Sequence, residues 1–167
     1  QGASTWVVEV LRWGYRPDLW ERPPLTRVPR SFPDPAKHQI LTQEINKMLV
    51  KGALEEVHDL DSPGFYSRLF VVPKPGGKWC PVIDLKALNW YLKIPKFSME
   101  SLQSIWGALL PGNFTISIDL QDAYFHVPIR RSFRKYLRIS HEGRVYQFRA
   151  LPFGLSTAPW LFTRIMN

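Results

Sequence analysis

The 167-residue chain is 45% hydrophobic, which excludes a disordered tail and allows either one domain or two closely packed subdomains. Its 22 Lys and Arg residues outnumber its 14 Asp and Glu residues, and the formal net charge of +8 favours polyanionic partners. It contains no recognisable secretory signal, only one cysteine, and no apolar run of the roughly 20 residues that span a bilayer, so we expect an intracellular protein, cytoplasmic or nuclear and not secreted.

The first elements that we expect are two helices separated by a proline-rich arm. Residues 6–13 have the composition of a short helix that Gly14 would end. Residues 17–37 hold six prolines and should be extended, with little regular structure. From about residue 38 to residue 50 the apolar side chains recur at helical spacing, and Gly52 supplies a C-terminal stop.

Two β-hairpins and a final helix are expected in the rest of the chain. The first hairpin covers residues 68–85 and has a glycine-rich tip with two lysines, and the second covers residues 135–148. Between them, Ser98 is a suitable N-cap for a helix that the Pro-Gly pair at 111–112 would end. The final helix begins near Thr157. This mixed order of elements predicts an α+β fold.

Residues 114–120 predict a β-strand that ends in an acidic turn. Apolar side chains alternate along it with Thr115, Ser117 and Asp119, so we expect the Asp119 carboxylate to point away from the apolar layer. Residues 122–124 (Asp-Ala-Tyr) follow directly. Two interpretations stay open on this pattern alone: a metal-and-nucleotide site, or a strand that ends in a turn-forming aspartate.

Four motifs occur in an order that resembles the reverse transcriptases of retroelements, and the match is closest to the DIRS-like and gypsy-like lineages. The likeness extends from about residue 37 to the end of the chain. The motifs are Phe65–Phe70 (FYSRLF), Pro81–Asn89 (PVIDLKALN), Asp119–His126 (DLQDAYFH) and Ala150–Pro159 (ALPFGLSTAP).

This resemblance implies the fingers and partial palm of a right-hand polymerase, truncated before the Asp-Asp hairpin that completes the family's metal site. It divides the chain into five parts. These are an N-terminal helix and Pro-rich arm (1–36), the first part of the fingers with the hairpin 68–85 (37–93), the first part of the palm with the catalytic strand (94–126), a second fingers hairpin (127–156) and the start of a palm helix (157–167).

The resemblance also implies template-directed DNA synthesis by two-metal nucleotidyl transfer. The implied partners are an RNA or DNA template-primer and deoxynucleoside triphosphates, and the implied cofactor is a pair of Mg²⁺ ions. Asp119 would be the catalytic residue and would bind metal together with the Leu120 carbonyl. Tyr124 would exclude a 2′-hydroxyl, although a plain core tyrosine is the alternative. The remaining residues that would contact the nucleotide are Lys74, Asp122, Ala123, Phe153 and Gly154.

Basic side chains around the second hairpin could follow a template backbone, but a merely solvated basic face is an equal competitor. A solvated hairpin lysine is likewise the alternative for Lys74. The candidates for nucleic-acid binding are Arg130, Arg131, Arg134, Lys135 and Arg138.

The chain departs from the family pattern in two ways. It stops at Asn167, inside the final helix, so we expect a fragment that is inactive by itself; the parent protein could also carry ribonuclease H. Cys80 stands where the family usually has an arginine for the triphosphate, and Trp160 also occupies a position where relatives often have arginine. These departures favour a second hypothesis, a decayed or domesticated nucleic-acid-binding protein without catalytic activity.

Overall fold

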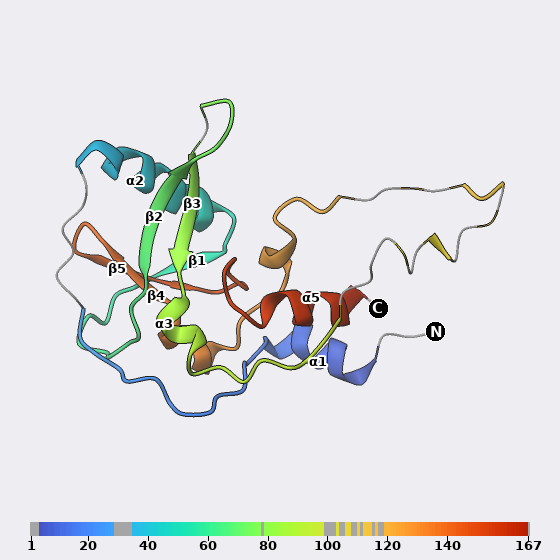
Figure 1. Cartoon of the computed structure of the whole chain (residues 1–167). Helices are drawn as coiled ribbons and strands as arrows, with labels where there is room; N and C mark the ends of the chain where they lie inside the picture. Colours follow the sequence, from blue (N-terminus) through green and yellow to red (C-terminus); the bar gives the residue numbers. More distant parts are fainter. Residues whose placement is uncertain are drawn as a thin grey trace.

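The computed structural model describes residues 4–28, 35–77, 79–98, 103, 106–107, 110, 112–114, 116 and 119–166. Figure 1 shows α2 lying against two small sheets, with α1 and α5 next to each other at the opposite end. The elements are α1 (Thr5–Trp13), α2 (Pro35–Val50), β1 (Leu54–Val57), β2 (Arg68–Pro73), β3 (Trp79–Asp84), α3 (Lys86–Asn89), the 3₁₀ turns η1 (Ala123–His126) and η2 (Arg131–Tyr136), β4 (Arg138–His141), β5 (Arg144–Phe148) and α5 (Ala158–Met166).

Helix α2 joins the two sheets. Its buried side chains Leu41, Ile45 and Met48 recur at helical spacing, and the helix contacts β1, β2 and β3. The chain leaves the helix at Gly52, whose φ of 70° is favourable for glycine, while the Ala53 N–H donates to the Met48 carbonyl at 2.9 Å. The predicted helix is therefore confirmed, and it begins three residues earlier than expected, with Pro35 in its first turn.

The first predicted hairpin is confirmed. Strands β2 and β3 pair antiparallel, with Arg68 opposite Asp84 at one end and Pro73 opposite Trp79 at the other. Because the pair is regular to its end, the loop that carries Lys74 projects from the end of the two-stranded sheet (Figure 1).

The second predicted hairpin forms part of a three-stranded sheet in the order β1-β5-β4. Its first strand begins at Arg138, not at residue 135, because residues 131–136 form the turn η2 and bury Phe133 and Tyr136 in the core. Strand β1 was not expected from the sequence. It pairs with β5 through the register Leu54–Phe148, so the sheet joins the end of α2 to the second hairpin.

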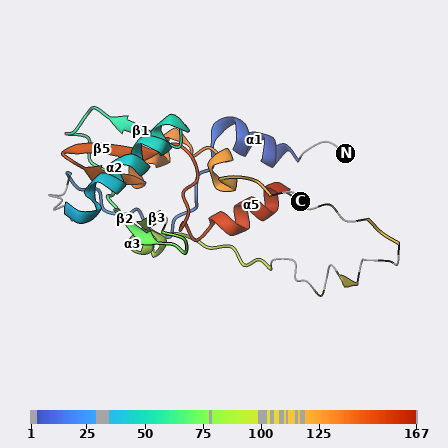
Figure 2. The ribbon, with the colours of Figure 1, turned by 90° about the horizontal axis from the view of Figure 1, so that it is seen from above.

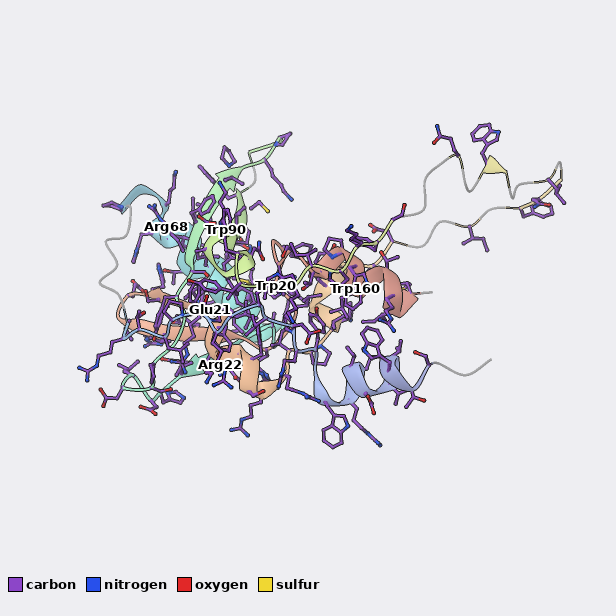
Figure 3. The ribbon with its side chains drawn as sticks, turned by 60° about the horizontal axis from the view of Figure 1, so that its bottom comes forward. Trp20, Glu21, Arg22, Arg68, Trp90 and Trp160 are labelled. Atoms are coloured by element: carbon purple, nitrogen blue, oxygen red, sulfur yellow. The ribbon has the colours of Figure 1, made fainter. Side chains whose placement is uncertain are left out.

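Helix α1 lies next to α5, where Figures 1 and 2 both place it. The rings of Trp6 and Trp160 meet edge to face with centroids 5.9 Å apart, and the Arg164 guanidinium lies 4.1 Å from the Trp6 ring centroid. Figure 3 shows Trp160 on α5, close to α1. Trp160 therefore has a packing role that an arginine would not reproduce.

The end of α1 is anchored to the middle of the chain. Gly14 has a φ of 85°, and a Cβ at this position would lie 2.4 Å from the backbone nitrogen of Arg130. The Tyr15 N–H donates to the Pro128 carbonyl, and the Arg130 N–H donates to the Tyr15 carbonyl. The predicted end of the helix at Gly14 is confirmed, and the close approach explains why glycine is needed there.

The predicted strand over residues 114–120 is not present at the positions that the structure describes. Phe114 and Ile116 are fully or largely exposed, and Asp119 and Leu120 are also exposed. No described strand pairs with this segment, and a single extended segment leaves its backbone groups without the partners that define a strand. Most of the helix predicted from Ser98 lies outside the described residues.

Candidate nucleotide-binding site

A pocket of about 440 Å³ lies between α2, the β2–β3 hairpin and the segments around residues 122–125 and 148–154. It brings together four residues that the sequence analysis assigned to nucleotide binding, Lys74, Asp122, Phe153 and Gly154. The other lining residues are Glu44, Lys47, Met48, Lys51, Leu69, Cys80, Pro81, Val82, Ile83, Phe125 and Phe148.

Three lysines line this pocket, and two of them are paired with acidic residues that also line it. Lys74 comes from the hairpin loop, is exposed, and has no hydrogen bond or ion pair with any described residue. Lys47 comes from α2 and Lys51 from the turn that directly follows it, and neither was predicted. The Lys51 Nζ lies 2.5 Å from the Asp122 Oδ2, and the Lys47 Nζ lies 2.6 Å from the Glu44 Oε1. The i, i+4 spacing of these lysines at the end of a predicted helix was a usable signal, but the sequence does not show that they border a pocket.

Phe125 and Phe153, which line the pocket, belong to an aromatic cluster that also includes Tyr124 and Phe162, which do not line it. The Tyr124 ring lies 4.9 Å from the Phe153 ring and 5.5 Å from the Phe162 ring, measured between centroids. Phe125 also contacts Phe153, at 5.7 Å. Phe153 is nonetheless half exposed. Ala123 lies at the start of η1, partly buried, beside this cluster.

The side chain of Asn89 holds the Phe153–Gly154 turn in place through two hydrogen bonds. The Asn89 amide donates to the Gly154 carbonyl at 2.9 Å, and its oxygen accepts from the Ser156 N–H at 3.0 Å. Gly154 has a φ of 93°, and an added Cβ would lie 3.4 Å from the Ile83 carbonyl oxygen. The sequence analysis did not assign this positioning role to Asn89, although Asn89 ends the second of the four motifs.

Asp119 and Leu120 precede the turn that leads into η1. Both are exposed, and no described residue pairs with the Asp119 carboxylate. A carboxylate and a backbone carbonyl are oxygen donors of the kind that Mg²⁺ binds, so these residues fit part of such a site. Among the described residues, no cluster of three metal-ligating side chains includes Asp119. The nearby Asp122 is held in the left-handed region (φ 51°) and is already paired with Lys51.

The basic residues of the second hairpin divide into two groups. Arg138 is only 4% exposed, and its guanidinium donates to the Ser62 carbonyl, the Ser62 hydroxyl and the Gln147 side chain. Arg134 donates to both carboxylate oxygens of Glu55, at 3.0 and 3.1 Å. These two arginines therefore stabilise the fold, and these internal bonds leave them less available to nucleic acid than the sequence suggests; nucleic-acid binding by them stays a prediction.

The second group of basic residues remains accessible. Arg130 and Arg131 are exposed at the start of η2, and Lys135 is partly buried with its Nζ 5.4 Å from the Tyr136 ring centroid. For these three residues, nucleic-acid binding stays a prediction.

Glu55 makes the folded state sensitive to acid. Burial raises the pKa of Glu55, but hydrogen bonds from Gln147 and Arg134 and the charges of Arg134 and Arg149 outweigh it, so the pKa lies below the ordinary value of 4.5. A lowered folded-state pKa contributes stability above the unfolded pKa and loses it as the pH falls through the folded pKa. We therefore expect the free energy of unfolding to decline as the pH falls below about 4.5.

Glu55→Gln tests this contribution. The variant should be less stable than wild type by about 1–2 kcal/mol at pH 7, because a charged acceptor is lost, and its stability should fall less steeply below pH 4.5. Urea unfolding of the 167-residue chain across this pH range measures both effects. Glu56→Gln is the matched control, since Glu56 has only a 3.9 Å contact with Arg144. Equal acid sensitivity in wild type and Glu55→Gln would contradict the assignment.

The pocket, its lysines and the exposed Asp119 are the parts expected of a nucleotide polymerase. The family model of reverse transcriptase (RNA-dependent DNA polymerase) matches residues 72–167. The chain belongs to the reverse transcriptase family. The predicted α+β fingers and partial palm fold is thereby confirmed, as is the assignment to a reverse transcriptase of retroelement or retroviral polyproteins.

The chain is similar to longer proteins of viruses and transposons. It is 24% identical over 150 residues to a polyprotein of Cassava vein mosaic virus, which covers 87% of this chain and 22% of that polyprotein. It is 27% identical over 139 residues to the transposon Tf2-3 polyprotein of Schizosaccharomyces pombe, which covers 83% of this chain and 10% of the relative. The chain thus spans less than a quarter of these relatives.

Solved structures show the same fold. The prototype foamy virus protease–reverse transcriptase is 21% identical, with a TM-score of 0.67, over 89% of this chain and 20% of the other. The foamy viral enzyme in complex with an RNA/DNA hybrid is 22% identical, with a TM-score of 0.62, over 82% of this chain and 18% of the other. No helix among the described residues is long and apolar enough to cross a membrane.

Proposed function

We propose that this chain forms the nucleotide-binding part of a reverse transcriptase that copies a template into DNA. The observation that carries the proposal is the pocket that joins Lys74, Asp122, Phe153 and Gly154, four residues that the sequence motifs select. Lys47, Lys51 and Lys74 line it, and so do Phe125 and the half-exposed Phe153. This combination suits a triphosphate on one side and a sugar and base on the other.

The roles of the site residues follow from their positions. Lys74 would bind the outer phosphates, because its charge has no other described partner. Lys51 would hold Asp122 in place, so that the turn at Asp122 and Ala123 presents its backbone to the phosphates. Phe153 and Gly154 would lie under the base and sugar. Asp119 and the Leu120 carbonyl would hold Mg²⁺, which neutralises charge on the transferring phosphoryl group when bound.

The finer assignments also belong to this proposal. The four motifs support placement in the DIRS-like or gypsy-like lineages and the division into fingers (37–93 and 127–156) and palm (94–126 and 157–167). The single cysteine is consistent with an intracellular site of action. Template-primer would lie along the exposed Arg130 and Arg131. Deoxynucleoside triphosphates are the substrates that the pocket and Tyr124 favour.

One specific observation supports the alternative, a nucleic-acid-binding protein without activity. Cys80 lines the pocket, half-buried, and its thiol can offer neither charge nor a bidentate donor set to a triphosphate. Primer extension on an RNA template, by the complete protein that contains this chain and with Mg²⁺ present, separates the two functions. Extension supports the polymerase. Salt-dependent binding of duplex without extension supports the alternative.

Tyr124→Ala tests the sugar selectivity of the pocket. Removal of the ring beside Phe153 should open space for a 2′-hydroxyl, so the preference for deoxynucleotides over ribonucleotides should fall about 10- to 100-fold. The measurement is the ratio of kcat/KM for the two substrates in the complete protein. Tyr124→Phe keeps the ring and should keep the ratio. An unchanged ratio in Tyr124→Ala would show that Tyr124 is only a packing residue.

A further inference from the structure

A second group of polar side chains lies where the first half of α2 meets the turn between β4 and β5. His38 and Thr42 come from α2, His141 is the last residue of β4, and Glu142 begins the turn that follows it. None of the four lines the nucleotide pocket. The proposed function therefore leaves this group without a role.

The two imidazoles and the carboxylate converge on one point. The rings of His38 and His141 lie 4.9 Å apart between centroids, with 33° between their planes. The His38 Nε2 contacts the Glu142 carboxylate, and the His141 Nε2 lies 4.0 Å from its Oε2. One ligating atom from each of the three residues lies within 4.8 Å of the others. Zinc ligands at about 2.0–2.2 Å from the ion lie roughly 3.4 Å from each other, so small side-chain rotations close the site.

The Thr42 hydroxyl contacts both histidines. It donates to the His38 carbonyl at 3.1 Å and lies 2.8 Å from the His141 Nε2, so a bound ion would take this nitrogen over from the hydroxyl. The His38 Nδ1 is buried and has no hydrogen-bond partner in the described part of the chain. Glu142 adopts a φ of 51°, uncommon outside glycine, immediately before Gly143. Positive φ at both Glu142 and Gly143 forms the two-residue turn of the β4–β5 hairpin, and this turn holds the Glu142 carboxylate beside the two imidazoles.

The donor set decides which ion would bind. Two imidazole nitrogens and one carboxylate oxygen are ligands of zinc sites and of other late first-row divalent metals. Mg²⁺ instead prefers oxygen ligands and keeps much of its water. We propose that His38, His141 and Glu142 form a binding site for a divalent transition metal of the zinc type, with water in the fourth position. The ion would link α2 to the β4–β5 hairpin, independently of the nucleotide pocket.

The test is a titration of the 167-residue chain with ZnCl₂, followed by calorimetry and by thermal unfolding. We expect one saturable equivalent and a rise in the unfolding temperature with zinc concentration, because the ion binds the folded state. His38→Gln, His141→Gln and Glu142→Gln should each weaken binding at least about tenfold. MgCl₂ at the same concentration should give neither effect.

Two control variants keep the result specific. His58→Gln removes an exposed histidine elsewhere, and Cys80→Ser removes the one thiol; both should bind zinc as wild type does. The absence of saturable zinc binding would overturn the proposal, as would wild-type affinity in His38→Gln and Glu142→Gln. Loss of binding in Cys80→Ser would place the ion elsewhere and also overturn it. If His141→Gln does not fold, the variants of the less buried His38 and Glu142 decide the outcome.

Discussion

Asp119→Asn is expected to reduce nucleotide addition by the complete protein about a thousandfold, while the 167-residue chain keeps its stability. The substitution preserves the size of the side chain and removes the charge that a divalent ion requires. Asp119 is exposed and no described residue pairs with it, so its loss should leave the fold unchanged. Activity and stability therefore report on different properties of the same residue.

Two measurements are needed. Single-turnover primer extension with Mg²⁺ gives the rate of nucleotide addition in the complete protein, and urea unfolding gives the stability of the chain. Asp61→Asn is the matched control, because Asp61 is also an exposed aspartate but lies outside the four sequence motifs, whereas Asp119 begins the third of them. It should retain activity. An Asp119→Asn protein with near wild-type rates would contradict the assignment of Asp119 as the catalytic carboxylate, whereas a destabilised variant would show a structural role.

Arg138→Ala is expected to lower the free energy of unfolding by about 2–4 kcal/mol. Arg138 is buried, and its guanidinium bonds both the backbone and the side chain of Ser62. A Cβ at Gly64 would lie 2.4 Å from the Arg138 Cδ, so the segment around Gly64 is packed directly onto this side chain. Truncation would leave the Ser62 and Gln147 acceptors without their donor and would open a cavity.

Urea unfolding of the chain measures this loss, with Arg131→Ala as the matched control. Arg131 is exposed in the neighbouring turn, so its removal should change stability by no more than about 0.5 kcal/mol. The same pair of variants separates folding from nucleic-acid binding. Arg131→Ala should weaken salt-dependent binding of duplex by the complete protein without unfolding it. If Arg138→Ala were as stable as wild type, the structural assignment of Arg138 would be wrong.

The sequence predicted the elements that depend on local pattern. The helical spacing of Leu41, Ile45 and Met48 defines α2, and the stops at Gly14 and Gly52 follow from backbone conformations that glycine adopts without strain. The first hairpin followed from two β-rich runs around a glycine-rich loop. Strand β1 was missed because four residues with two glutamates (Leu54–Val57) carry no clear strand pattern, and only pairing with β5 makes them a strand.

The features of the candidate site also divide into those that the sequence predicted and those that only the structure revealed. Sequence motifs were sufficient to select Lys74, Asp122, Phe153 and Gly154, which the pocket brings together. They could not show that Lys51 pairs with Asp122, because the two residues are 71 positions apart. They also could not distinguish Arg131 from Arg138, since both belong to one basic run and only the packing of Ser62 buries the second.

The sequence by itself therefore determined the family, most of the local elements and the candidate residues of the nucleotide site, because short-range spacing encodes turns, helices and motifs. Only the tertiary structure decided which charges are free and which are used internally. Glu55 and Arg134 are 79 positions apart, and His38 and Glu142 are 104 positions apart. Such contacts form when the core closes around α2 and the three-stranded sheet, and no local pattern in the chain specifies them.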